Sequence, residues 1–290
     1  MRAITLLYHD VVPSGDWASS GFQGADADEY KMDGEDFRRH LKAIKDRFAG
    51  PLTLAPELSS GASAREDVPV LLTFDDGGAG AIYTADMLDE FGWKAHFFVT
   101  AGRIDSAGFL TSRQVRELHA RGHVIGSHSY THPLQMARCP AAQLDDEWRR
   151  SVACLDDILG ERTLTASVPG GYYSRQVAVS AARAGIKWLF NSEPVTRSHT
   201  VEGCLVLGRF GAKRGSPSAW SAAVVAGEGG VRTREYMFWN TKKVAKMILG
   251  PVWLRVRVAL LERASRAPQS PPGEPGSGRY GNSPGDGPVR

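Results

Sequence analysis

Short apolar runs alternate with longer amphipathic stretches between residues 1 and 212, and this pattern limits the fold more than any other feature of the chain. Each run is short and rich in β-branched or aromatic residues, which is typical of a buried strand. We predict strands at Ile4–Tyr8, Val68–Phe74, Ala95–Val99, Val124–Gly126, Leu164–Val168, Ile186–Phe190 and Leu205–Phe210.

The stretches between these runs show helical periodicity. In Gln143–Leu159, large apolar side chains recur at three- and four-residue steps and so fall on one face of a helix. Strands that alternate with helices pair in parallel. Seven such strands in about 210 residues indicate an α/β fold, a deformed (β/α)7 barrel, with a doubly wound open sheet as the alternative. The other predicted helices are Phe37–Phe48, Ile82–Phe91 and Ser174–Ala184.

Charge and composition divide the chain into three parts. The whole chain carries a net charge of only +3, which argues against nucleic acid as a partner. Residues 231–266 hold nine Lys or Arg against two Glu. Residues 267–290 hold six Pro, six Gly and almost no large apolar side chains, too little to stabilise an ordered structure. We predict a barrel domain at 1–230, a basic helical segment at 231–266 and a disordered tail at 267–290.

The sequence also bears on the compartment. The N-terminus lacks the pattern of a signal peptide, and no stretch of 18 apolar residues exists, so we expect a cytoplasmic protein. The basic apolar stretch 242–263 packs on the barrel or, as the alternative, makes peripheral contact with the inner membrane face. The three cysteines form no C-x-x-C pair, which indicates neither a disulfide framework nor a cysteine zinc site.

Two short motifs follow predicted strands. The first is Asp-Asp-Gly, with Asp75 and Asp76, directly after the second strand, and the second is a histidine pair, His128 and His132, after the fourth. Neutral imidazole is a common metal ligand, and of two adjacent carboxylates one can bind a metal while the other takes a proton. Each motif alone also fits a blander explanation, a turn for the first and an incidental pair for the second. In a barrel both would lie on the rim where chemistry collects.

Together, the two motifs resemble the NodB-homology polysaccharide deacetylases, carbohydrate esterase family 4. The resemblance runs from about Val68 to Phe210 and is carried by segments 71–77, 95–99 and 126–133, in the family's order and spacing. It implies the family's deformed barrel and a metal-dependent hydrolase that removes N-acetyl groups.

The resemblance also implies roles for individual residues. Asp75 is then the catalytic base, and one divalent metal ion is bound by Asp76, His128 and His132. Zinc is the expected metal, with cobalt, nickel or manganese as alternatives. Backbone N–H groups for the oxyanion come from the loop after the fifth strand, at Gly170, Gly171 and Tyr172. An ordinary β-turn is the alternative for that loop.

Three positions depart from the family pattern. Ser167 stands where the family has an arginine that fixes the base, and Arg209, at the end of the last strand, is the candidate replacement. The late histidine that protonates the leaving amine is missing, but His9 follows a Leu-Tyr pair in the first strand. First and last strands of a closed barrel are neighbours, so we predict a circularly permuted variant with His9 as the general acid. Gly78 replaces an aromatic residue, which leaves the shape of the cleft open.

The functional prediction is N-deacetylation of an amino sugar in a glycan, oligosaccharide or glycolipid. The alternatives are a non-catalytic glycan-binding protein on the same fold, favoured by Ser167 and the missing late histidine, and an amidase for a non-sugar C–N bond. Surface pairing for Arg209 and a strand-end structural role for His9 also stay open. The loop Val12–Asp33, with Trp17, Phe22 and Tyr30, would wall the cleft or cover its own core.

Overall fold

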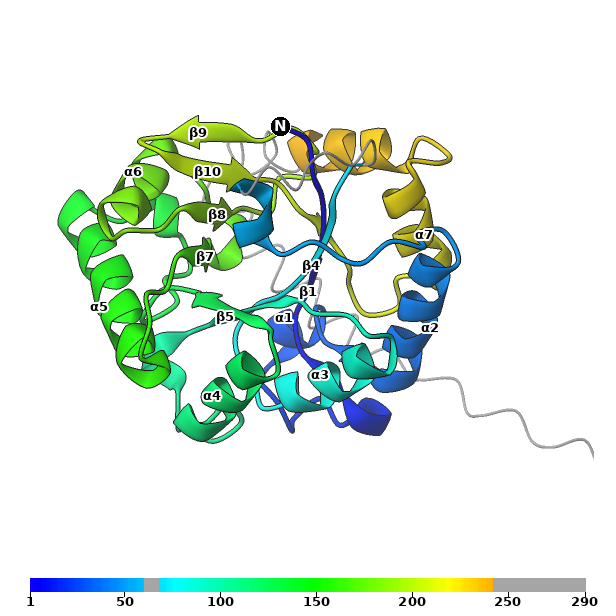
Figure 1. The fold of residues 1–290 in the computed structure, drawn as a ribbon, viewed down its shortest axis with the longest axis horizontal. Helices are drawn as coiled ribbons and strands as arrows, with labels where there is room; N and C mark the ends of the chain where they lie inside the picture. The colour runs from blue at the N-terminus through cyan, green and yellow to red at the C-terminus, as the bar shows by residue number, and fades with distance from the viewer. Residues whose placement is uncertain (60–67, 242–290) are drawn as a thin grey trace, which may run out of the picture.

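The computed structural model of the protein describes residues 1–59 and 68–241. Its centre is one curled sheet in the strand order β11-β1-β4-β5-β6-β7-β8-β10-β9, flanked by helices (Figure 1). The strands of this sheet are β1 (Ile4–Tyr8), β4 (Val70–Phe74), β5 (His96–Val99), β6 (Val124–Ser127), β7 (Thr165–Ser167), β8 (Trp188–Phe190), β9 (His199–Val201), β10 (Cys204–Leu207) and β11 (Phe210–Gly211). A second, two-stranded sheet pairs β2 (Val11–Val12) with β3 (Met32–Asp33).

Every neighbouring pair in the large sheet is parallel except β9 with β10. The sheet curls until the chain ahead of β9 reaches the start of β1, where Ala3 N–H donates to the Thr196 carbonyl (2.9 Å) and Ser198 N–H to the Met1 carbonyl (3.2 Å). The architecture is therefore the predicted α/β fold with a deformed, barrel-like sheet. Because the strands are parallel, the residues that follow them collect on one rim.

Side chains cap the amino termini of three helices, and Asp33 caps the first of these, α2. Thr111 and Gln114 form a reciprocal capping box at the start of α4, and Ser174 caps α6. The α-helices are α1 (Ala25–Asp28), α2 (Gly34–Lys45), α3 (Ala81–Glu90), α4 (Ser112–Ala120), α5 (Ala141–Leu159), α6 (Arg175–Arg183) and α7 (Ser218–Ala226), and residues 231–241 are also helical. The 3-10 helices are η1 (Pro13–Gly15), η2 (Ala55–Ser59), η3 (Ala101–Arg103), η4 (Met136–Arg138) and η5 (Pro169–Gly171).

The seven predicted strands are present, with one division. The run Leu205–Phe210 forms β10 and then β11, because the chain turns at Gly208 and Arg209, where the Arg209 N–H donates to the Glu193 carbonyl (2.9 Å). β11 then pairs with β1 instead of continuing beside β8. The four predicted helices are also present, whereas the short helices α1, α4 and α7 were not predicted.

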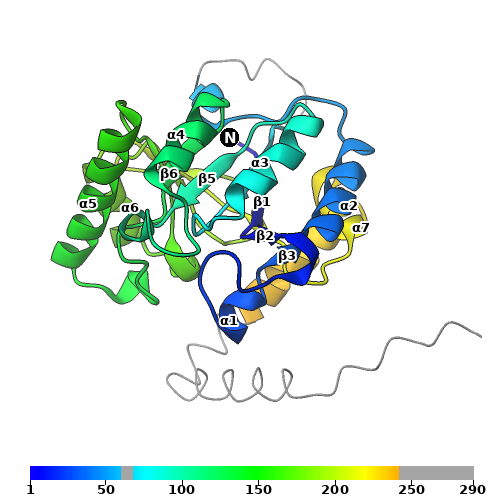
Figure 2. The same cartoon turned by 90° about the horizontal axis from the view of Figure 1, so that it is seen from below.

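β1 lies between β4 and the edge strand β11, so it is paired on both sides. Its residues Ile4, Leu6, Leu7 and Tyr8 are all buried, as expected of a strand covered on both faces. α2 and α7 lie side by side and cover one flank, while α5 and α6 cover the opposite flank (Figures 1 and 2). The first strand of the chain is thus a central part of the core.

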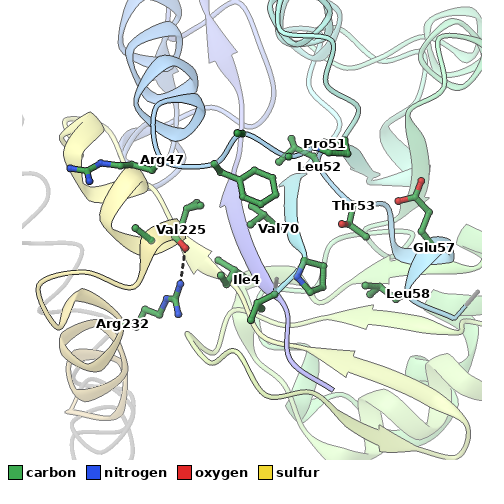
Figure 3. A pocket seen from close by; sticks show the side chains of 16 residues that line it. Ile4, Arg47, Pro51, Leu52, Thr53, Glu57, Leu58, Val70, Val225 and Arg232 are labelled. Carbon is green, nitrogen blue, oxygen red and sulfur yellow. Dashed lines mark hydrogen bonds between the residues drawn. The ribbon is translucent and has the colours of Figure 1, made fainter. Parts of the chain in front are cut away.

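A cavity of about 690 Å³ opens at the amino ends of β1 and β4 (Figure 3). Ile4 and Val70, which are paired across these strands, line it together with Arg47 and Arg232. The Arg232 guanidinium donates to the Val225 carbonyl there (2.8 Å). This end of a (β/α) barrel serves stability, and chemistry collects at the other end.

Part of the predicted domain organisation lies outside the described residues. The basic stretch 242–263, the rest of the segment to residue 266 and the tail 267–290 belong to this part, so the three-part division stays a prediction. Within residues 1–59 and 68–241, no helix has both the length and the apolar character needed to cross a membrane.

Candidate metal-dependent active site

The predicted site residues come together at the carboxyl ends of neighbouring strands. Asp75 and Asp76 follow β4, His128 follows β6, and His9 follows β1. In the sheet order, β5 separates β4 from β6, and β1 lies on the other side of β4. The rim thus brings together residues that are far apart in the sequence. His9 and His128, for example, are separated by 119 positions.

Asp76, His128 and His132 form a group that fits one metal ion. Their ligand atoms all lie within 4.8 Å of one another. His128 Nε2 is 3.4 Å and His132 Nε2 is 3.5 Å from the same Asp76 oxygen, Oδ1. Zinc–ligand bonds of about 2.0–2.2 Å in tetrahedral geometry place ligand atoms roughly 3.4 Å apart. The two distances to Asp76 therefore match the spacing between ligands of one tetrahedral zinc ion.

Electrostatics keeps these groups in the forms that bind a metal. Burial raises the pKa of Asp76, but the neighbouring imidazoles of His128, His9 and His132 outweigh it and hold that pKa well below its ordinary value. Burial, together with the charge of His128, lowers the pKa of His132 to about 4. At neutral pH the site therefore presents a carboxylate and a neutral imidazole, as divalent metals require.

The ligand-bearing backbone is held in unusual conformations. Asp76, Ser129 and His132 have φ values of 78°, 62° and 61°, in the left-handed region that non-glycine residues seldom adopt. Such conformations persist only where surrounding contacts fix them, and they cluster at functional sites. In the histidine loop, the Ser129 hydroxyl accepts the His132 N–H (3.0 Å) and so stabilises the turn.

Glu147 of α5 is a second anchor of this loop. One of its carboxylate oxygens accepts the N–H groups of Tyr130 (2.9 Å) and Thr131 (2.8 Å), and the other accepts the Thr131 hydroxyl. Glu147 was not predicted. Its signature in the sequence is a carboxylate on the apolar face of a helix, directly before the buried Trp148. Acidic residues are seldom so deeply buried without partners.

Asp75 is enclosed by partners on both oxygens. The Arg209 guanidinium donates to Oδ1 (2.7 Å) and Oδ2 (2.8 Å), and the Ser167 hydroxyl donates to Oδ1 (3.0 Å). Asp75 is 5% exposed and Arg209 is fully buried. Burial raises the pKa of Asp75, but the charges of Arg209 and His128 outweigh it and hold the pKa below its ordinary value. The structure thus places Arg209, the candidate replacement, in a bidentate pair with Asp75.

Arg209 is itself fixed by the strand ends. Its Nε donates to the Asn191 carbonyl (2.9 Å), and its Nη1 also lies 3.3 Å from the Thr73 hydroxyl. Asn191 follows β8 and Thr73 lies in β4, so the guanidinium spans the inside of the curled sheet. A surface role for Arg209 does not agree with this position.

His9 lies on the same rim but makes fewer contacts. Its ring is 4.9 Å from the Tyr30 ring, centroid to centroid, and its Nδ1 has no hydrogen-bond partner within the described part of the chain. Burial lowers the pKa of His9, and the negative charges of Asp76 and Asp75 oppose this effect. His9 is therefore close enough to both carboxylates to interact with them.

The loop at Gly170, Gly171 and Tyr172 contains η5 and follows β7. The N–H groups of Gly171 and Tyr172 donate to the Val168 and Pro169 carbonyls at 3.3 and 3.4 Å. The Gly170 N–H makes no such bond among the residues the structure describes, and Gly170 has a φ of 59°. Of the three predicted donors, Gly170 is thus the one whose N–H has no backbone acceptor in the described part of the chain.

The structure explains why position 78 holds a glycine. A Cβ at this position would come within 2.0 Å of an Asp10 carboxylate oxygen and 2.4 Å of the Ser20 hydroxyl. Ser20 donates to Asp10 (2.8 Å) and accepts the Gly80 N–H (2.8 Å), so the N-terminal loop is attached to the turn after Asp76. Burial, reinforced by the charge of Asp76, raises the pKa of Asp10 to about 7.

The attached loop brings its own aromatic ring to the site. Figure 2 shows this segment, which includes α1, at the lower edge of the view. The Phe22 ring lies 4.7 Å from the His132 ring and 5.1 Å from the Phe109 ring. Trp17 lies elsewhere, under the Arg214 guanidinium (3.7 Å). Phe22 and Tyr30 thus border the site beside His132 and His9, while Trp17 does not contact it.

Comparisons with known proteins relate this chain to one family. Residues 62–189 match the family model described as polysaccharide deacetylase, which confirms the resemblance seen in the sequence. "Putative polysaccharide deacetylase YxkH" of Bacillus subtilis (strain 168) is 28% identical over 225 residues, which cover 76% of this chain and 75% of YxkH.

A second curated relative matches over a smaller part of both chains. "Peptidoglycan-N-acetylglucosamine deacetylase PgdA" of Listeria monocytogenes is 26% identical over 153 residues, covering 52% of this chain and 31% of PgdA. Among solved structures, BC0361, a polysaccharide deacetylase from Bacillus cereus, superimposes with a TM-score of 0.65 at 17% identity, covering 78% of this chain and 69% of BC0361. At that identity the likeness concerns the fold.

Proposed function

We propose that this chain, which belongs to the polysaccharide deacetylase family through residues 62–189, is a metal-dependent hydrolase that removes N-acetyl groups from amino sugars in a glycan, oligosaccharide or glycolipid. One observation carries the proposal. The carboxylate of Asp75 lies beside three side chains, Asp76, His128 and His132, whose ligand atoms are all close enough together to hold one metal ion. The name of PgdA, a deacetylase of N-acetylglucosamine, supports the substrate class.

Each residue then has a chemical role. Asp76, His128 and His132 hold one divalent ion, which supplies Lewis acidity to the site when bound. Zinc suits one carboxylate and two imidazoles, and cobalt, nickel or manganese are the alternatives. The Asp75 Oδ2 atom, which lies 3.9 Å from His128 Nε2, accepts a proton from the attacking water.

The remaining steps concern the two products. The Gly170 N–H donates to the oxyanion of the tetrahedral intermediate, since a backbone donor there stabilises developing charge. His9 then donates a proton to the leaving amine as the C–N bond breaks. Acetate and a free amino sugar leave, and Asp75 returns its proton to solvent.

Acetate release tests this function. The purified protein is incubated with N-acetylglucosamine oligomers, with and without a chelator, and with zinc added back. We expect acetate from the intact protein, loss with chelator and recovery with zinc. Asp75→Asn should bind the metal normally and release no acetate, whereas an equally active Asp75→Asn would remove the base assignment.

The same assay separates the two alternatives. A glycan-binding protein without turnover would bind the oligomers and release no acetate at any metal concentration. An amidase for other C–N bonds would leave the oligomers intact and hydrolyse cyclic imides or formamides, which therefore belong in the substrate panel.

A separate prediction concerns His9. His9→Ala should lower kcat about 100-fold, within the range of general acid catalysis, and leave the metal content at one ion per chain. Tyr30→Ala is the matched control, because Tyr30 contacts the His9 ring without a proposed proton-transfer role. Near-normal turnover of His9→Ala would end the assignment of His9 as the acid.

A further inference from the structure

Ser167 occupies the position where the family pattern places an arginine, and its hydroxyl connects two residues of the proposed site. Ser167 Oγ lies 2.6 Å from His128 Nδ1 and 3.0 Å from Asp75 Oδ1. Ser167 is 0% exposed, and His128 is 1% exposed. Water therefore does not compete for these bonds.

The number of protons fixes the direction of both bonds. A serine hydroxyl carries a single proton and can donate it to one partner only. The Arg209 guanidinium donates to both oxygens of Asp75, so that carboxylate accepts, and the Ser167 hydroxyl donates its proton to Asp75 Oδ1. His128 must then donate from Nδ1 to Ser167 Oγ, which leaves Nε2 of the neutral ring without a proton.

The resulting tautomer is the one that a metal ligand needs. His128 Nε2 is the atom that lies 3.4 Å from Asp76, on the side of the predicted metal. An arginine at position 167 has five donors and no acceptor, so it could not receive the Nδ1 proton of His128. Because Arg209 pairs with the base, position 167 is available for an acceptor.

We propose that Ser167 is a positioning residue that holds His128 in its metal-binding tautomer and at the same time orients the base Asp75. The inference rests on the proposed metal site and adds a component to it. In metal sites generally, the group that accepts the second N–H of a ligating histidine fixes the ring, and its loss weakens metal binding about 10- to 100-fold.

Metal affinity without substrate tests the proposal. Zinc binding by the full chain is measured by competition with a chromophoric chelator, for wild type, Ser167→Ala and Ser221→Ala. Ser221 is equally buried but lies on α7, so Ser221→Ala controls for the loss of a buried hydroxyl. We expect the zinc Kd to rise about 10- to 100-fold in Ser167→Ala and to be unchanged in Ser221→Ala. Equal affinities in all three proteins would overturn the proposal.

The tautomer gives a second measurement that needs no metal. Imidazole ¹⁵N shifts of His128, recorded at pH 8 in the metal-free wild type, should show the proton on Nδ1. A proton on Nε2 would overturn the inference whatever the affinities. If Ser167→Ala does not fold, Ser167→Cys keeps the shape and supplies a weak acceptor, with an intermediate Kd expected and a wild-type Kd counting against the proposal.

Failure of the deacetylase proposal and failure of the Ser167 proposal give different results in these experiments. A wild type that binds zinc and shows the Ser167 effect, yet releases no acetate from any sugar, would reject the deacetylase proposal and keep this one. A wild type that deacetylates and binds zinc identically to Ser167→Ala would do the reverse.

Discussion

At the scale of single residues, the pair of Asp75 and Arg209 dominates the site. Both side chains are buried, and the guanidinium donates to both carboxylate oxygens. Two charges in a buried pair cost desolvation energy, so the pair adds little net stability relative to apolar residues. Removal of one partner, in contrast, leaves an uncompensated buried charge and typically costs about 3–5 kcal/mol. The pair therefore keeps the Asp75 carboxylate ionised out of contact with water.

Arg209→Met should raise the pKa of Asp75, because burial then acts without the opposing charge. Asp75 must be deprotonated to act as a base, so the acidic limb of the kcat/KM profile should move to higher pH. The free energy of unfolding should fall by about 3–5 kcal/mol. The measurements are a pH–rate profile and a denaturant titration.

Arg232→Met is the control for this variant. Arg232 is partly buried, and its guanidinium donates to carbonyls of α7 and not to a carboxylate. An acidic limb that stays in place in Arg209→Met would show that the guanidinium does not control the base. In wild type, the stabilisation from the depressed pKa of Asp75 is complete above its unfolded pKa of about 3.9 and is lost at lower pH.

Sequence reasoning succeeds at this scale where a residue follows a predicted strand directly. Asp75, Asp76 and His128 are of this kind, because the end of an apolar run fixes their place on the rim. Ser167 is different, since its role depends on distances to His128 and Asp75 that no local pattern contains. Arg209 could be named as a candidate only, because its partner lies 134 positions away.

At the scale of elements, α5 acts on the metal site through one side chain. Glu147 holds the backbone between His128 and His132 by accepting two N–H groups and a hydroxyl. Its apolar neighbours Leu144 and Trp148 fix α5 against the sheet. The helix thereby restricts the motion of the loop that carries His132.

Glu147→Ala should weaken zinc binding about tenfold, since it leaves the Tyr130 and Thr131 N–H groups without their acceptor and loosens the loop. Each unsatisfied group costs about 1–3 kcal/mol, so the melting temperature should fall as well. Asp157→Ala, an exposed position on α5, serves as the comparison. Unchanged zinc affinity with a lowered melting temperature would restrict Glu147 to a structural role.

The loop Val12–Asp33 is the element that distinguishes the cleft. Its aromatic residues were expected to wall the cleft or to cover the core, and they divide between these roles. Phe22 contacts His132, whereas Trp17 stacks under Arg214. Sequence patterns identify such a loop but not its contacts, because irregular backbone has no period to follow.

Phe22→Ala should raise KM for N-acetylglucosamine oligomers about tenfold, equivalent to about 1.4 kcal/mol, and leave zinc affinity unchanged. The physical reason is the loss of an aromatic face beside the reacting group. Trp17→Ala should leave KM unchanged. If Phe22→Ala altered zinc affinity and not KM, the ring would support His132 without contacting the sugar.

At the scale of the whole molecule, the first strand of the chain is paired on both sides within the large sheet. β1 pairs with β4 along its full length and with β11 on its other side. The alternation of strands and helices predicted the barrel-like fold, and the short loops between them follow from it. Closure of the barrel predicted that the first and last strands are neighbours, but the register of β1 with β11, in which Leu6 pairs with Phe210, could not be predicted from local pattern.

Deletion of residues 1–8 should prevent folding and not merely remove His9 from the rim. Four buried side chains of β1, at about 1.5–3 kcal/mol each, contribute roughly 6–12 kcal/mol, comparable to the whole net stability of a domain. Circular dichroism and proteolysis of the deleted chain measure this. A deleted chain that keeps cooperative unfolding would show that the sheet does not depend on β1.

The order of the strands along the chain also sets when the chemistry can begin. Asp75 leaves the ribosome 134 residues before Arg209, a delay of roughly 7–27 seconds at about 5–20 residues per second. During that interval the nascent polypeptide holds its acidic and histidine groups without the guanidinium that keeps the base ionised. Only a chain synthesised beyond Arg209 can therefore form the buried pair that the proposed base requires.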